Sequence, residues 1–167
     1  MERKAREQQA PAEHARGFSG RAPLLDIQKA SARIVMVFCD THYDAASVLV
    51  RDFVSTEFPK VESIRFSDML AGDVAADMLL INSLSPDTIV GNMGAIDSVL
   101  GAFKKGNPDS AIVIVNLYGK GNVHGAFLHE LESRSVAKVL EGPVGYMTMI
   151  DAALGQMGNG LIKNSEQ

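Results

Sequence analysis

Polar residues follow four apolar runs of this sequence, and their side chains are the ones that could do chemistry. They are Cys39 and Asp40 after the first run, Asn82 after the second, Asn116 after the third, and Gly142-Pro143 after the fourth. Only one of them is a carboxylate, so a hard cation such as Mg²⁺ would be left with amides and carbonyls as its other ligands. No convergent acid–base or nucleophile set emerges, which argues against an enzyme and predicts no metal and no resident cofactor.

The segments that must position these residues alternate between strand and helix patterns. Continuous apolar or β-rich runs predict strands at 34–38, 61–66, 78–81, 111–115 and 136–140. Apolar residues at helical spacing predict helices between them, with a short helix or bare loop broken at Gly72. This alternation predicts an α/β fold, a flavodoxin-like three-layer α/β/α sandwich around a five-stranded parallel sheet of order 2-1-3-4-5.

Composition excludes several classes of protein. The 167 residues suit one domain, and 16 Lys and Arg against 20 Asp and Glu give a net charge of −4. Such a surface does not favour nucleic acid, which needs a basic stripe. A single cysteine excludes a disulfide framework and a multi-cysteine zinc site. No apolar stretch suits a membrane span or a signal peptide, so we expect a cytoplasmic protein with no membrane partner.

The chain divides into a tail, a domain and a short end. Residues 1–30 hold few large apolar side chains and predict a disordered N-terminal tail. The domain is expected at 31–158, followed by a frayed C-terminal tail at 159–167. Residues 1–23 carry five basic and three acidic residues, a net charge of +2 that leaves −6 for the rest of the chain.

Residues 33–157 resemble the receiver domain of two-component response regulators. In that family the first strand ends in an acidic pair that holds Mg²⁺, and here Cys39 and Asp40 stand at that pair, so one acid is missing. The third strand ends in the Asp that accepts the phosphoryl group, and a Pro follows four residues later. This chain keeps the Pro as Pro86 but has Asn82 at the acceptor position.

The last two strands show the same loss of charge. The family's fourth strand ends in Thr or Ser, where this chain has Asn116, and its fifth ends in Lys followed by a cis-linked Pro. Here Pro143 is kept and Gly142 replaces the Lys. An amide is a poor nucleophile, and the missing Lys removes the cation that would pair with a phosphoryl group. The resemblance therefore implies a pseudo-receiver, a signalling or adaptor protein that acts without phosphorylation.

Such a protein acts through contacts with a protein partner. The resemblance suggests a histidine kinase, a regulator, another signalling protein or a second copy of the chain. The family's contact face maps to Val123–Leu131, Val136–Leu140 and Tyr146–Met157. The residues predicted to contact a partner are Val123, Phe127, Val139, Tyr146 and Met149.

The alternative is a small-molecule domain of the same fold that binds cobalamin, flavin or a nucleotide in a crevice formed by Asp40, Asn82 and Gly119. The segment from Asp40 to Ala45 resembles the DxHxxG signature of cobalamin-binding domains, but Ala45 replaces its Gly. The interpretation without a ligand is that His42 lies in an exposed loop and that Asp40 caps the next helix.

Residues 119–125, GKGNVHG, follow a predicted strand and open a helix, so their backbone N–H groups could cradle phosphate. A flexible strand-to-helix loop is the favoured interpretation. His124 and His129 are five residues apart, which does not suit a metal pair, and they are predicted to lie on the helix surface.

Overall fold

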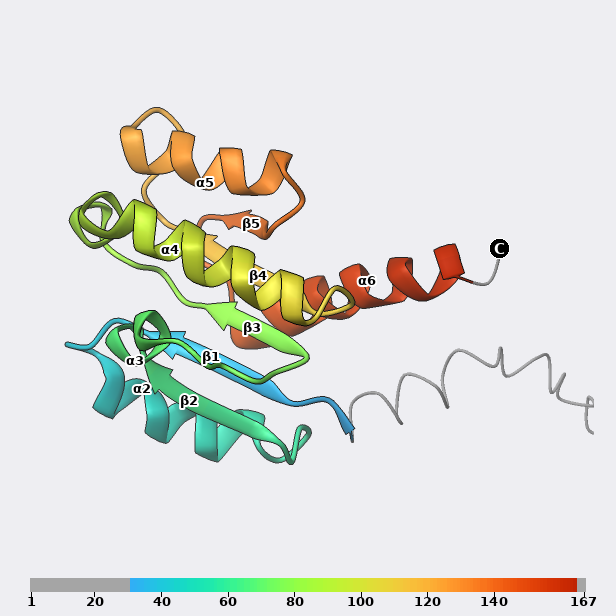
Figure 1. The fold of residues 1–167 in the computed structure, drawn as a ribbon. Helices are drawn as coiled ribbons and strands as arrows, with labels where there is room; N and C mark the ends of the chain where they lie inside the picture. The colour runs from blue at the N-terminus through green and yellow to red at the C-terminus, as the bar shows by residue number, and fades with distance from the viewer. Residues whose placement is uncertain (1–30, 165–167) are drawn as a thin grey trace, which may run out of the picture.

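Five parallel strands make one sheet in the order β2-β1-β3-β4-β5 (Figure 1). The computed structural model describes the backbone of residues 31–164, and their side chains except those of Phe53 and 158–164. The predicted tail at 1–30 lies outside this description. The strands are β1 (Ile34–Phe38), β2 (Val61–Arg65), β3 (Met78–Ile81), β4 (Ala111–Asn116) and β5 (Lys138–Glu141).

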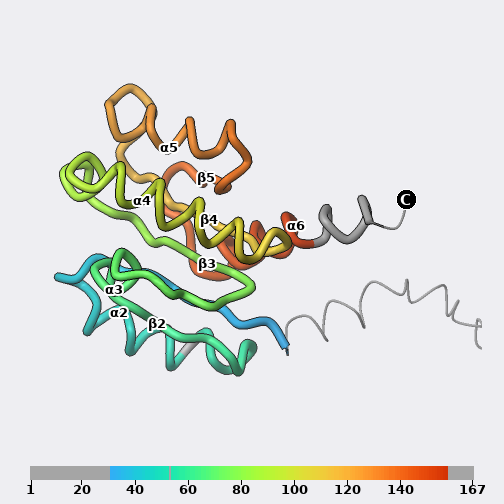
Figure 2. The backbone as a smooth tube through the Cα atoms, in the orientation of Figure 1, coloured from blue at the N-terminus to red at the C-terminus, as the bar shows by residue number. Residues whose placement is uncertain are grey.

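Helices cover both faces of the sheet, so the predicted flavodoxin-like α/β/α fold and its strand order are confirmed. The helices are α2 (Tyr43–Leu49), the π-helix η1 (Val50–Val54), α3 (Phe66–Ala71), α4 (Pro86–Gly106), α5 (Val123–Ser133) and α6 (Tyr146–Asn164). Helices α2 and α6 share one face with η1, and α3, α4 and α5 lie on the other, as the backbone trace shows (Figure 2). Helix α6 continues past the domain end expected at residue 158.

Burial on both faces follows from alternation along the strands. In β1, Ile34, Met36 and Phe38 join the apolar cluster under α2 and α6, whereas Val35 and Val37 join the one under α3, α4 and α5. Every residue of β1, β3 and β4 is buried, and the edge strands β2 and β5 are partly exposed. Uninterrupted apolar runs therefore mark the three central strands.

Strand β5 begins two residues later than predicted, because the backbone N–H groups before it form hydrogen bonds with the end of α5. The N–H groups of Val136 and Ala137 donate to the Leu131 carbonyl, at 2.9 and 3.4 Å, and Ser135 has a positive φ of 58°. These residues close the helix and cannot pair with β4, so β5 begins at Lys138.

The helix after β1 also differs, since its hydrogen bonding changes at Val50. The Ser55 N–H donates to the Val50 carbonyl at 3.3 Å, a π-type bond. Val50 and Val54 are buried, whereas Leu49, which the helical spacing placed among the apolar residues, is exposed.

Helix α3 is the short helix expected between the second and third strands. It ends at Gly72, whose φ of +100° suits glycine, and the chain then runs to β3 without another helix. Helix α4 is long and has a local start signal: the Ser85 hydroxyl accepts from the Thr88 N–H at 3.2 Å, and Pro86 is the first helical residue. Among the helices that the structure describes, none is long and apolar enough to cross a bilayer.

Candidate functional site

The predicted site residues lie along one edge of the sheet. Cys39 follows β1, Asn82 follows β3, Asn116 ends β4 and Gly142 follows β5. Because the strands are parallel, their carboxyl ends meet at this edge, where α/β folds bind ligands. What each side chain does there decides whether the edge is a reactive site.

Asp40 ties the loop after β1 to α3. Its Oδ1 accepts from the Ser67 N–H at 3.1 Å, and Ser67 is the second residue of α3. Hydrogen bonds donated by the Ser67 hydroxyl and backbone N–H hold the pKa of Asp40 below its ordinary value. The prediction that Asp40 caps the helix after β1 is wrong: that helix has His42 at its N-cap and no side-chain cap. A local pattern suggested the nearer helix, but the carboxylate caps α3, 27 residues away in sequence.

Asn82 and Cys39 form short-range contacts. The Asn82 Oδ1 accepts from the N–H of the next residue, Ser83, at 2.9 Å, and its own N–H donates to the Val37 carbonyl at 2.9 Å. Cys39 is half-buried, with its Sγ 3.2 Å from the Thr41 hydroxyl oxygen. The Asn82 amide therefore stabilises the backbone turn after β3, and the Cys39 thiol contacts a neighbouring side chain.

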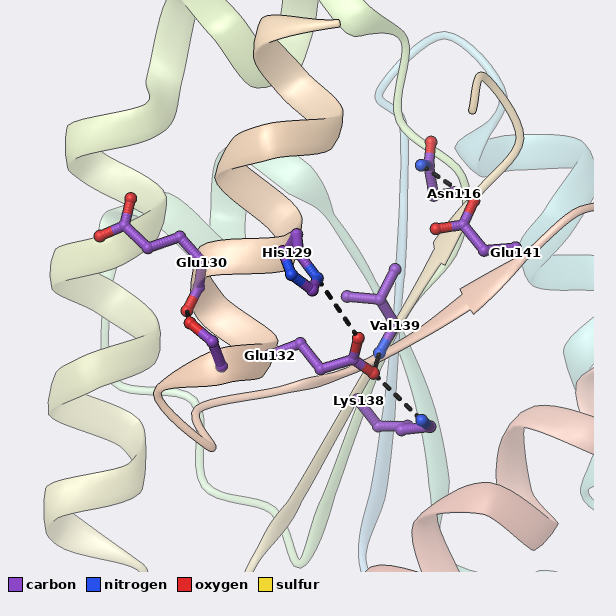
Figure 3. A network of polar contacts seen from close by, with 8 residues as sticks. Asn116, His129, Glu130, Glu132, Lys138, Val139 and Glu141 are labelled. Atoms are coloured by element: carbon purple, nitrogen blue, oxygen red, sulfur yellow. Dashed lines mark hydrogen bonds and ion pairs between the residues drawn. The ribbon is translucent and has the colours of Figure 1, made fainter. Parts of the chain in front are cut away.

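Asn116 holds the loop after β4 in place. Its side-chain Nδ2 donates to the Gly119 carbonyl at 3.0 Å and to Glu141 Oε2 at 3.2 Å, and its Oδ1 accepts from the Tyr118 N–H at 3.1 Å. The residue is 2% exposed. Figure 3 shows it directed at Glu141 on the neighbouring strand. These three contacts join the ends of β4 and β5 to one loop.

Gly142 continues this connection with a backbone that only glycine adopts readily. Its N–H donates to the Asn116 carbonyl at 2.9 Å, and its φ is +83°. A lysine at this position would be strained, so the backbone itself disfavours the residue that receivers carry there. The peptide bond to Pro143 is trans, which corrects the cis bond that the resemblance implies.

The edge is therefore a hydrogen-bonded scaffold. Asn116 and Gly142 are in direct contact, whereas no hydrogen bond of the described residues joins the side chains of Asp40, Asn82 and Asn116. Within the part of the chain that the structure describes, no three His, Cys, Asp or Glu side chains gather as a metal site. Asp40, Asn82 and Asn116 each accept a hydrogen bond from a backbone N–H of a loop or helix at this edge.

The prediction that both histidines of α5 lie on its surface is wrong for His124. His129 is exposed, but His124 is 1% exposed, and its ring lies edge-on to Tyr118 with centroids 6.1 Å apart. A Cβ on Gly125 would lie 2.6 Å from the Gly119 carbonyl oxygen, so the loop packs tightly on the first turn of α5. Side chains of a helix lean toward its N-terminus, which places the His124 ring beside this loop. The His124 Nε2 is buried, and none of the residues that the structure describes forms a hydrogen bond with it.

The predicted partner residues separate into surface and core. Val123 is 63% exposed, and Phe127 is half-buried. Tyr146 is also half-buried, with its ring edge-on to Phe38, and burial raises the pKa of its hydroxyl. Val139 and Met149 are buried and cannot contact a partner directly, which corrects two of the five.

The reason for both errors is which way each side chain faces. Val139 belongs to the apolar cluster under α3, α4 and α5, and Met149 to the cluster under α2 and α6. The contact face of the resembled family names whole segments, and it does not say which residues of β5 and α6 face inward.

The structure also exposes apolar residues in other segments that follow β4 and β5. Leu117 and Tyr118 in the loop after β4 are exposed, as is Met147 near the start of α6. We call Leu117, Tyr118, Val123 and Met147 the β4–β5 edge surface, since they belong to the segments that follow these neighbouring strands. Leu117 and Met147 were missed because an apolar residue beside a strand or in a helix is ordinarily part of the core.

Glu132 of α5 closes the outer edge of the sheet. Its Oε1 accepts from the Val139 N–H at 3.2 Å and from Lys138 Nζ at 3.0 Å, with His129 at 4.0 Å from its other oxygen (Figure 3). Burial pushes the pKa of Glu132 up, but the hydrogen bonds from Lys138 and Val139 outweigh it and lower that pKa. An edge N–H occupied by a side chain cannot receive another strand.

Comparison of the chain with protein-family models, with curated proteins and with solved structures finds no match.

We expect Asp40→Ala to destabilise the fold by about 1 kcal/mol at neutral pH, because the Ser67 N–H in the first turn of α3 loses its acceptor. The folded-state pKa of Asp40 is lowered, so its contribution is full above the unfolded pKa of about 3.9 and is lost as the pH falls through the folded value. Urea unfolding from pH 7 to pH 2 should show wild type and variant converging below about pH 4. Asp151→Ala, which removes an exposed carboxylate from α6, is the control. An equal difference at all pH values contradicts the role.

We expect Asn116→Asp to cost about 3 kcal/mol, because a buried carboxylate would face the Gly119 carbonyl and Glu141 instead of donating to them. Asn82→Asp makes the same chemical change but keeps the acceptor for the Ser83 N–H, so its cost should stay below about 1 kcal/mol. Urea unfolding at pH 7 compares them. Similar losses in both would refute the role assigned to Asn116.

Proposed function

We propose that this protein is a phosphorylation-independent signalling or adaptor protein of receiver type, which acts by binding a protein partner at the β4–β5 edge surface. The observation that carries the proposal is the replacement of charged side chains at the carboxyl edge of the sheet. Where a receiver gathers charged groups, this chain has amides and glycine committed to its own backbone, and exposed apolar side chains beside them.

The loss of phosphotransfer is supported by two positions. Asn82 offers an amide where a carboxylate nucleophile is required, and that amide already accepts from Ser83. Gly142 has a positive φ, so restoring the missing lysine would strain the backbone. A signal that depends on an aspartyl phosphate therefore has neither its acceptor nor its cation.

Partner binding is supported by the distribution of exposed apolar residues. Seven large apolar side chains are exposed in the described part of the chain, and the four of the β4–β5 edge surface are among them. These four come from segments that follow two neighbouring strands at one edge of the sheet, where exposed apolar side chains favour an interaction site. Because Glu132 occupies the outward N–H of β5, we expect the partner to bind by side-chain contact and not by adding a strand.

The partner class stays that of the resemblance: a histidine kinase, a regulator, another signalling protein or a second copy of the chain. We place this activity in the cytoplasm, where response regulators and their partners act.

The full-length chain should gain no phosphoryl group when incubated with acetyl phosphate and Mg²⁺, because Asn82 cannot form the acyl phosphate. Intact-mass spectrometry measures this, with an active receiver domain treated in parallel. Beryllofluoride and Mg²⁺ should likewise leave its amide NMR spectrum unchanged. A phosphorylated species or a shifted spectrum at Asn82 would sink the proposal.

The variant Val123→Glu should lose a partner that the wild-type chain captures from native lysate, because a charge would enter the apolar contact. Val48→Glu is the matched control: Val48 is 41% exposed on α2, away from the β4–β5 edge surface. Quantitative mass spectrometry compares the captured proteins. Capture of the same proteins by all three chains counts against this surface.

A further inference from the structure

A second candidate surface lies on the α3 side of the sheet, near β2. Because α3 has only six residues, residues 72–77 run along the sheet where a longer helix would lie, and the trace after α3 shows this path (Figure 2). Two grooves flank residues 72–74, with volumes of about 290 and 280 Å³. The shortened helix thus leaves the sheet face incompletely covered.

The first groove has an apolar lining. It lies between residues 72–74 and the C-terminal half of α4, and its lining includes Val74, Leu79, Val99, Ala102 and Phe103. Leu79 and Phe103 are buried and join the core cluster, whereas Val74 and Val99 are half-buried. Val74, Val99 and Ala102 therefore offer the apolar surface of the groove, beside the polar Asp73, Ser98 and Asn107.

The second groove has an acidic rim. Glu62 of β2, Asp68 of α3 and Asp73 are exposed there, against one basic residue, Arg33. Asp73 belongs to both grooves, so the acidic rim and the apolar lining are continuous. An occupant should combine basic and apolar side chains.

We propose that these grooves bind residues 16–29 of the chain's own N-terminal segment. This segment, RGFSGRAPLLDIQK, has three basic residues and one acid. Leu24, Leu25 and Ile27 supply the apolar side chains for the first groove, and Arg21 and Lys29 supply charges for the acidic rim.

The place where the chain enters the domain favours this occupant. Arg33 itself lines the second groove, and its N–H donates to Asp77 Oδ2 at 2.8 Å, which fixes the entry point. Ile27 is six residues before Arg33, a reach of about 20 Å when extended, at 3.3–3.6 Å per residue. A tethered segment has an effective concentration of about millimolar, so weak contacts suffice to hold it.

Charge complementarity points the same way. Residues 1–23 have a net charge of +2, and the remainder of the chain has −6. The grooves lie on β1 to β3 and α4, whereas the β4–β5 edge surface lies beside β5, so this inference does not depend on the proposed function.

A spin label on the full-length chain tests the proposal. In a Cys39→Ser background, Ser19→Cys places a single label within the segment. We expect the amide NMR signals of Val74, Val99 and Ala102 to be strongly broadened, and those of Ile150 and Ala153, on the opposite face, to keep their intensity. Equal broadening of both faces, or none at the grooves, overturns the proposal.

Two variants and one mixing experiment complete the test. Leu24→Asp with Leu25→Asp should restore the groove signals, whereas Gln8→Asp with Gln9→Asp, the same added charge outside the segment, should not. Retained broadening in the leucine variant contradicts docking. In a mixture of spin-labelled chains with isotope-labelled chains that carry no spin label, broadening of the grooves would assign them to a second copy and overturn the intramolecular assignment.

Discussion

Burial of both faces of a parallel sheet is the constraint on which the rest of this structure depends. Each central strand must supply apolar residues to two helical layers, and the backbone hydrogen bonds of parallel strands require helices to carry the chain back between them. As a consequence, all five strands end at one edge, and residues far apart in sequence become neighbours there. Asn116 and Gly142 are in contact for this reason, although 25 residues separate them.

Polar side chains at that edge stabilise the backbone of the loops and helices around them. Asp40 caps α3 and Asn116 joins the loop after β4 to β5, so both stabilise segments that the apolar layers leave uncovered. The unsatisfied backbone groups at the ends of strands and helices create this need. Residues that resemble remnants of a phosphorylation site therefore have a physical reason to be present, whatever their origin.

The two proposed surfaces arise where the helical layers are incomplete. The shortened α3 leaves grooves beside residues 72–74, and the loop packed onto α5 by Gly125 leaves Tyr118 and Val123 exposed. At the outer edge, Glu132 keeps β5 from recruiting another strand. Both proposed surfaces thus include loops that the sheet holds in place.

The sequence by itself determined the strands, their order and the edge where the polar residues meet, because periodic burial and short connections leave few topologies. Only the tertiary structure decided which helix Asp40 caps, that His124 is buried, and that Val139 and Met149 belong to the core. Those outcomes depend on contacts between segments distant in sequence and on which face an edge residue presents. A local pattern of residues reveals neither the distant contacts nor the face of an edge residue, because packing against elements elsewhere in the chain decides both.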